Sequence, residues 1–202
     1  MTTVRHIERL WDAKAWGRLL RELLENRAES STRLEVEVHS LVAAAAMAMI
    51  RLDELGQSHT PLFGRLIRTL LASQDPDGGW RDPATTALCL RALLIDRGQG
   101  LAIDRGLRYL GTMQKDEGAW PNEPIRRMGA DGFTSALVMF HLSDAPAFRA
   151  AVRFDDAVRW FTRHADELDN EAKRLWSLAS LRCRTLVAAE REVAPLWSRR
   201  CA

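Results

Sequence analysis

Two aspartates stand where a carboxyl group could act as a general acid. Asp82 opens the segment DPATTA and Asp131 opens the segment DGFTSA, and an apolar run typical of a helix follows each of them. A lone carboxyl in an apolar cavity has a raised pKa and can then protonate a substrate. The same position also suits a helix N-cap, where the carboxylate accepts a hydrogen bond from the backbone. We favour capping and keep the general acid as the alternative.

The histidines and cysteines show no spacing typical of a metal site. No two of the five histidines lie three or four residues apart, and the three cysteines have no CxxC spacing. Zinc sites are usually built from such short spacings. His141 lies between Phe140 and Leu142, which favours a core histidine and leaves ligand binding as the alternative. We therefore expect no metal and no cofactor.

A polar loop supplies further candidate binding residues. The segment PNEPIRRMGADG, residues 121–132, carries Arg126 and Arg127, which could bind an anion or an acidic surface of a partner. Thr134 follows the loop and is a further binding candidate, although its hydroxyl can also bond to its own helix. Long loops often carry function, but an exposed loop without function is an equal alternative.

The elements that would position these side chains are helices. Apolar residues recur at helical spacing along the chain, proline and glycine separate the segments, and no segment makes a convincing strand. We predict an all-α fold of eight helices in four antiparallel pairs, forming one domain over residues 1–202. The predicted helices cover residues 4–26, 34–55, 61–73, 83–96, 103–114, 132–142, 154–164 and 170–189.

An internal repeat is the strongest signal in the sequence. Residues 65–80 and 105–120 match at an offset of 40, and a degenerate third copy at 154–165 lacks the glutamine and the Gly–Trp pair. The residues that define the repeat are Gln74, Asp77, Gly78, Gly79 and Trp80 in the first copy, and Arg105, Tyr109, Gln114, Glu117, Gly118 and Trp120 in the second.

The residue types of the repeat predict a structural role. A helix that ends at the glutamine leaves carbonyl groups without partners, and glycine can adopt the left-handed conformation that closes such an end. The tryptophan can then cover the junction, while the glutamine amide bridges the backbone of neighbouring turns. We predict that each copy clamps an outer helix to the inner helix that follows it, so that the helix pairs form an arc.

The segment RGLRYLGTMQKDEGAW, residues 105–120, resembles the QW motif of the terpenoid-cyclase and protein-prenyltransferase superfamily, also described as the squalene-cyclase or prenyltransferase/squalene-oxidase repeat. The resemblance covers residues 61–142 well and implies an α/α toroid of inner and outer helices. Four helix pairs would make this toroid incomplete, because the family ring has six or seven. An α/α barrel that processes glycans is the main alternative, since similar DGGW turns occur there.

The reactive residues of the family are missing. The resemblance places Asp82 and Asp131 near the DxDD segment of class II cyclases, but neither site keeps the middle or the final aspartate. The DDxxD motif of class I enzymes is missing as well. The zinc site of protein prenyltransferases needs an aspartate two residues before a cysteine, and Ala87 stands there before Cys89.

Composition restricts the partners and the location. A net charge of +2 without a basic block argues against nucleic acid. The longest apolar run, residues 41–50, is half of the roughly 20 residues that a membrane span needs. Arg5, His6 and Glu8 interrupt the region where a signal peptide would be apolar. We therefore expect a cytoplasmic protein without a transmembrane segment.

Two functions remain open at this point. The first is a non-catalytic α/α-toroid module that binds a protein partner or a second copy of itself, as one component of a multi-protein system. The second is an enzyme or enzyme subunit that acts on an isoprenoid or another apolar small molecule, with Asp131 or Asp82 as the general acid. A glycan-active barrel would need paired acids across one groove, and the sequence shows no obvious pair.

Overall fold

The computed structural model describes residues 31–96, 98–125 and 127–182, and this part of the chain is all-α, as the sequence predicts. It contains no strand, and residues 170–182 form a helix in addition to the labelled ones. The labelled helices are α3 (Ser31–Glu54), α4 (Pro61–Ala72), α5 (Pro83–Leu93), α6 (Gly100–Met113), α7 (Gly132–Leu142), α8 (Pro146–Ala151) and α9 (Phe154–Arg163).

The helices begin and end close to the predicted residues, with one addition. None of the predicted helices covers residues 143–153, but the structure has α8 there, with a proline in its first turn. Proline is favoured at that position because its missing N–H would have no helical partner. The predicted helix at residues 4–26 lies outside the described residues. Within the described residues, no helix combines the length and the apolar character that crossing a membrane requires.

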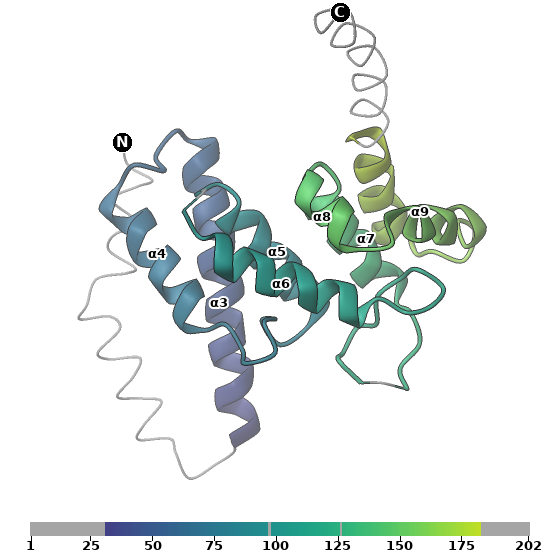
Figure 1. The fold of residues 1–202 in the computed structure, drawn as a ribbon, viewed down its shortest axis with the longest axis horizontal. Coiled ribbons are helices and arrows are strands. Elements are labelled where there is room, and N and C mark those ends of the chain that lie inside the picture. The colour runs from purple at the N-terminus through teal and green to yellow at the C-terminus, as the bar shows by residue number, and fades with distance from the viewer. Residues whose placement is uncertain (1–30, 97, 126, 183–202) are drawn as a thin grey trace, which may run out of the picture.

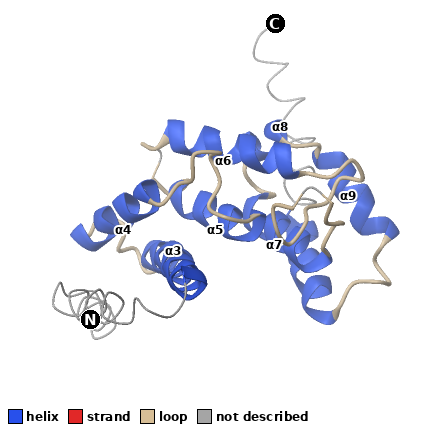
Figure 2. Cartoon of the chain, turned by 90° about the horizontal axis from the view of Figure 1, so that it is seen from below, coloured by secondary structure: helices blue, strands red, loops and turns tan. Residues whose placement is uncertain are grey.

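The helices form two layers. The inner helices α3, α5 and α7 pack side by side, α4 packs on α3, α6 packs on α5, and α8 packs on α6. Figure 2 shows α4, α6 and α8 along one side of the array and α3, α5 and α7 along the other. Successive helices therefore alternate between the layers from α3 to α8, and Figure 1 shows this array running from α4 to α9.

The composition of each helix explains its layer. The helices α5 and α7 bury residues around most of their circumference, as expected for helices covered on several sides. The outer helices α4 and α6 bury one apolar stripe each. Small side chains allow close packing inside the array, because Ala45 and Ala46 of α3 and Ala87 of α5 are fully buried. Trp80 and Trp120 are the largest fully buried side chains of the described residues.

In each copy of the repeat, one glycine brings the turn after an outer helix into direct contact with a later helix. Gly78 and Gly118 have φ angles of +95° and +103°, where only glycine is unstrained. A Cβ atom on Gly78 would lie 2.7 Å from the carbonyl oxygen of Arg105, and one on Gly118 would lie 2.4 Å from the carbonyl carbon of Asp156. The turn that contains Gly78 thus lies against α6, and the turn that contains Gly118 lies against α9. In neither case is there space for a side chain between the turn and the helix.

We predict that Gly118→Ala lowers the free energy of unfolding by about 2 kcal/mol or more, since it combines a left-handed φ with a clash against backbone. The matched control is Gly64→Ala, inside α4, where a new Cβ meets nothing within 4 Å. This control should raise the free energy of unfolding by roughly 0.5 kcal/mol. Urea denaturation followed by circular dichroism measures both, and equal effects of the two substitutions would contradict the packing described here.

Candidate functional site

The amide of Gln74 joins the first turn to the next outer helix. Its Nε2 donates to the carbonyl of Gly78 at 2.8 Å and to the carbonyl of Ala102 at 2.9 Å. The first bond closes the turn, and the second reaches the N-terminal turn of α6. We call residues 74–80 the first Gln–Trp turn and residues 114–120 the second.

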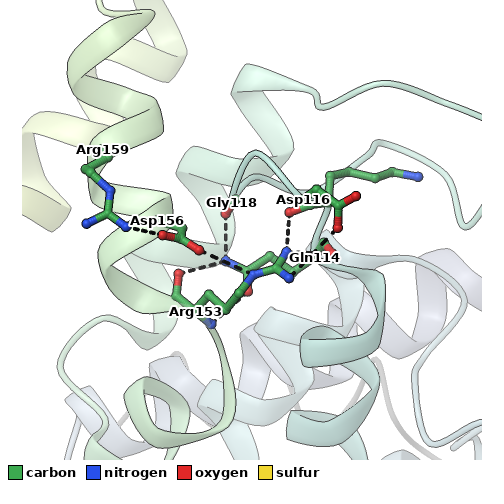
Figure 3. Close-up of polar contacts among 7 residues, drawn as sticks. Gln114, Asp116, Gly118, Arg153, Asp156 and Arg159 are labelled. Carbon is green, nitrogen blue, oxygen red and sulfur yellow. Dashed lines mark hydrogen bonds and ion pairs between the residues drawn. The ribbon is translucent and has the colours of Figure 1, made fainter.

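Gln114 makes the same pair of bonds in the second Gln–Trp turn. Its Nε2 donates to the carbonyl of Gly118 at 2.7 Å and to the carbonyl of Arg153 at 3.0 Å. Its Oε1 also accepts a hydrogen bond from the backbone N–H of Arg153 at 2.8 Å, as Figure 3 shows. The side chain of Gln114 is buried, so this amide satisfies its hydrogen bonds entirely within the protein.

The two tryptophans close the ends of the preceding outer helices. The indole Nε1 of Trp80 donates to the carbonyl of Leu70 at 2.8 Å, and that of Trp120 donates to the carbonyl of Leu110 at 2.9 Å. Both carbonyls lie in the last turn of their helix, and each also accepts one backbone N–H at 3.1 Å, from Ser73 and from Gln114 respectively. Each indole therefore adds a second hydrogen bond to a carbonyl at the end of the helix that leads into its own turn.

The backbone of each tryptophan is bound to the inner helix that follows. The N–H of Trp80 donates to the hydroxyl of Thr86 at 2.9 Å, and the N–H of Trp120 donates to the hydroxyl of Ser135 at 2.8 Å. Both hydroxyls are fully buried in the first turn of their helix. The first Gln–Trp turn therefore connects α4, α5 and α6, and the second connects α6 and α7 to Arg153, the residue directly before α9.

An arginine supports each Gln–Trp turn, from within α6 for the first turn and from the N-cap of α9 for the second. Arg105 donates to the carbonyl of Asp75, and Arg153 donates to the equivalent carbonyl of Lys115. In the aligned third copy Asp156 stands opposite Arg105, and Arg153 lies three residues earlier. Arg153 is the N-cap residue of α9 and so stands outside the helical segment that the alignment compares. The sequence alignment missed Arg153 for this reason.

Tyr109 packs on the glycine-rich part of the first Gln–Trp turn. Its ring occupies the place that a side chain on Gly79 would take, and its hydroxyl donates to the carbonyl of Arg81 at 3.2 Å. Burial, followed by nearby acidic groups, raises the pKa of Tyr109. Asp77 accepts a hydrogen bond from the N–H of Gly79 at 2.9 Å, whereas Glu117 of the second turn is exposed.

The two aspartates that the sequence marks as possible acids both cap inner helices. Asp82 accepts one hydrogen bond from the N–H of Thr85 and one from its hydroxyl, each at 2.8 Å. Asp131 accepts a bond from the N–H of Thr134 at 2.7 Å. These carboxylates compensate the backbone donors that every helix start leaves without a partner.

A third aspartate, which our sequence reasoning did not single out, has the same role. Asp169 precedes the helix at residues 170–182 and accepts a hydrogen bond from the N–H of Ala172 at 2.7 Å. Three helix starts thus use an aspartate with the same three-residue spacing. The recurrence of an aspartate directly before a helical segment was the signal available in the sequence.

The other predicted binding residues are not gathered in one site. Thr134 and His141 lie in the first and the last turn of α7, and Arg127 is exposed in the loop before that helix. Arg126 lies outside the described residues. The hydroxyl of Thr134 is 3.5 Å from the side-chain oxygen of Asn122, which ties the beginning of the loop to α7.

His141 is a partly buried histidine with a strongly perturbed titration. Burial first, and then the positive charges of Arg91 and Arg182, lower its pKa to about 4, while Asp144 acts in the opposite direction. Its ring lies edge-on against Phe140, with ring centres 5.1 Å apart. The imidazole is therefore neutral at pH 7, which suits a side chain packed at the end of α7.

The described surface also contains an open groove between α8 and α9, with a volume of about 530 Å³. We did not anticipate it, although the segment RAAVRFDDAVR shows the alternation of arginine and aspartate that lines it. Asp82 and Asp131 lie elsewhere. The residues that line the groove are Arg149, Val152, Arg153, Phe154, Asp155, Asp156 and Arg159.

Neither metal coordination nor a reactive thiol emerges from the described part of the chain. No group of three or more histidine, cysteine, aspartate or glutamate side chains lies there in an arrangement that could hold a metal ion. Cys89 is buried, and this burial, with a smaller effect of Asp82, raises the pKa of its thiol. A thiol of raised pKa is a poor nucleophile.

No family model, curated protein or solved structure matches the chain.

The low pKa of His141 predicts a specific loss of stability in acid. A histidine in the unfolded chain binds its proton near pH 6.5, whereas folded His141 does so near pH 4. The neutral form therefore contributes stability that is complete above pH 6.5 and is lost as the pH falls towards 4. The wild-type protein should lose up to about 3 kcal/mol relative to His141→Gln across this range. Urea denaturation at pH 7 and pH 4.5 measures the difference, and parallel curves would contradict it.

Proposed function

We propose that the chain is a non-catalytic protein-interaction module built on an incomplete α/α toroid. The observation that carries the proposal is the use of Asp82 and Asp131 as helix caps. A general acid needs a carboxyl that is held protonated and directed at a substrate. Here both oxygens of Asp82 and one oxygen of Asp131 accept hydrogen bonds from the first turn of the helix that follows.

The capping by Asp169 supports the same conclusion. This residue stands at a helix start that the family resemblance does not connect with acid chemistry, yet its carboxylate makes the same bond. The aspartates at inner-helix starts therefore have a sufficient structural reason to be there. The resemblance to the terpenoid-cyclase and prenyltransferase superfamily then bears on the scaffold and not on the reaction.

The Gln–Trp turns support a role as a scaffold that presents surfaces. Their polar groups bond to backbone groups of three helices, so this chemistry is used to hold the array together. In the described residues the inner helices α3, α5 and α7 pack side by side and carry outer helices on one side, and repeat arrays commonly use the surfaces of such layers to bind other proteins. The groove between α8 and α9 is one such surface.

Substitution of Asp131 distinguishes capping from catalysis. Asp131→Ala should lower the free energy of unfolding by about 1 kcal/mol, while Asp131→Asn, which can still accept the N–H of Thr134, should change it by only a few tenths. The general-acid alternative predicts instead that Asp131→Asn or Asp82→Asn folds normally and loses turnover. Incubation of the purified proteins with farnesyl and geranylgeranyl diphosphate, with product analysis by mass spectrometry, measures turnover.

Native mass spectrometry of the protein purified from its own host completes this test. The proposal predicts a companion protein chain in fixed stoichiometry, retained equally by the wild type and by Asp131→Asn. Turnover of an isoprenoid diphosphate that either asparagine variant abolishes would contradict the proposal.

A further inference from the structure

We propose that the groove between α8 and α9 binds a short acidic segment of a protein partner. Carboxylates of that segment would pair with Arg149 and Arg159, and an apolar side chain between them would pack on Phe154. This inference rests on the proposed function and specifies the surface and the chemistry of the partner. The groove has a suitable size, because about 530 Å³ lies within the range of sites that hold a few side chains.

The arginine on the α8 side of the groove is held in place by contacts within the protein. The Nε of Arg149 donates to the carbonyl of Ser143 at 2.7 Å, and its guanidinium carbon lies 5.3 Å from the centre of the Phe154 ring. An arginine fixed in this way loses little conformational freedom when a carboxylate binds. The contact with Phe154 also places a positive charge next to an apolar ring. A peptide with an acidic side chain beside an apolar one is complementary to these two groups.

The arginine on the α9 side is more accessible. The side chain of Arg159 is 61% exposed and pairs with Asp156, which also pairs with Arg153 at 3.4 Å. Figure 3 shows Asp156 between the two guanidinium groups. A guanidinium has five N–H donors, so pairing with one carboxylate leaves Arg159 able to bind another. Arg153 is already used to support the second Gln–Trp turn.

The distribution of charge favours a short acidic peptide over a nucleic acid. Three arginines and two aspartates line the groove, so the positive excess is one charge. A continuous polyanion would meet Asp155 and Asp156 as well as the arginines, and like charges in close contact suppress binding. A peptide can place single carboxylates against the arginines and an apolar residue against Val152 and Phe154. A peptide can provide this arrangement because its side chains differ from one residue to the next.

The repeat provides a matched control position. The offset of 51 that relates α9 to α6 places Arg108 opposite Arg159. The same offset of 51 relates the two backbone positions that the turn glycines contact. Gly78 lies against Arg105, and Gly118 lies against Asp156. Arg108 is exposed, as Arg159 is, but it does not line the groove. A general effect of surface charge would therefore be the same at both positions, whereas a groove effect would not.

The experiment is a selection from a phage-displayed library of random 12-residue peptides on the full-length protein. The selected peptides are labelled with fluorescein and titrated by fluorescence anisotropy against the wild type and the variants Arg159→Glu, Arg149→Gln and Arg108→Glu. A fluorescein-labelled 20-base-pair DNA duplex is titrated in parallel at 150 mM salt. Circular dichroism and urea denaturation confirm that each variant is folded, and because Arg159 is exposed, its variant keeps the test valid even if Arg149→Gln is unstable.

We expect the selected peptides to be rich in Asp or Glu with at least one large apolar residue. Their Kd should rise about tenfold or more in Arg159→Glu and severalfold in Arg149→Gln, and change less than about twofold in Arg108→Glu. Peptides without acidic residues, equal losses in Arg159→Glu and Arg108→Glu, or duplex binding that depends on Arg159 would each overturn the groove proposal. Peptides that bind every variant equally would contradict the groove as the binding site but not the proposed interaction module. Turnover of an isoprenoid would contradict the interaction module itself.

Discussion

A buried primary amide needs partners for its donors and its acceptor, and in this chain Gln114 finds them on two separate segments. Its amide bonds to Gly118 within the turn and to the N–H and carbonyl of Arg153 at the start of α9. An unsatisfied buried donor or acceptor costs about 1–3 kcal/mol. Displacing α9 by one residue would break both bonds to Arg153, and the backbone of Asp156 already stands where a side chain on Gly118 would lie. The amide therefore holds the start of α9 as well as the shape of its own turn.

This constraint allows the segments between the fixed points to vary. The loop at residues 121–131 lengthens the second copy, yet Asp131 still donates its N–H to the carbonyl of Trp120 and caps α7. Lengthening a surface loop costs little free energy. The connection from α7 to α9 likewise contains α8, and the groove lined by Arg149 and Arg159 arises there. The segments between the Gln–Trp turns, and not the turns themselves, thus contain the groove where we propose that a partner binds.

The sequence was sufficient to predict the parts of the structure that depend on local chemistry. The all-α class follows from helical periodicity, and the bonds of Gln74 and Gln114 follow from the capacity of a primary amide to bridge the backbone of neighbouring turns. Contacts between segments that are distant in the sequence were harder to predict. The support of the second turn by Arg153 was missed because Arg153 stands three residues before the aligned position, as the N-cap of α9. The groove was missed because it forms only where α8 meets α9, and because no predicted helix covered the residues of α8.

The most direct test of the account is native-state hydrogen exchange of the tryptophan indole groups, followed by NMR in the full-length protein. The account predicts that the Nε1–H of Trp80 and of Trp120 exchange as slowly as the most protected amides of α5, since each is bonded to a buried carbonyl beneath its turn. The half-buried Trp176 indole should exchange many times faster. Exchange of Trp80 or Trp120 at the rate of Trp176 would show that the turns open without unfolding of the array, and would contradict the account.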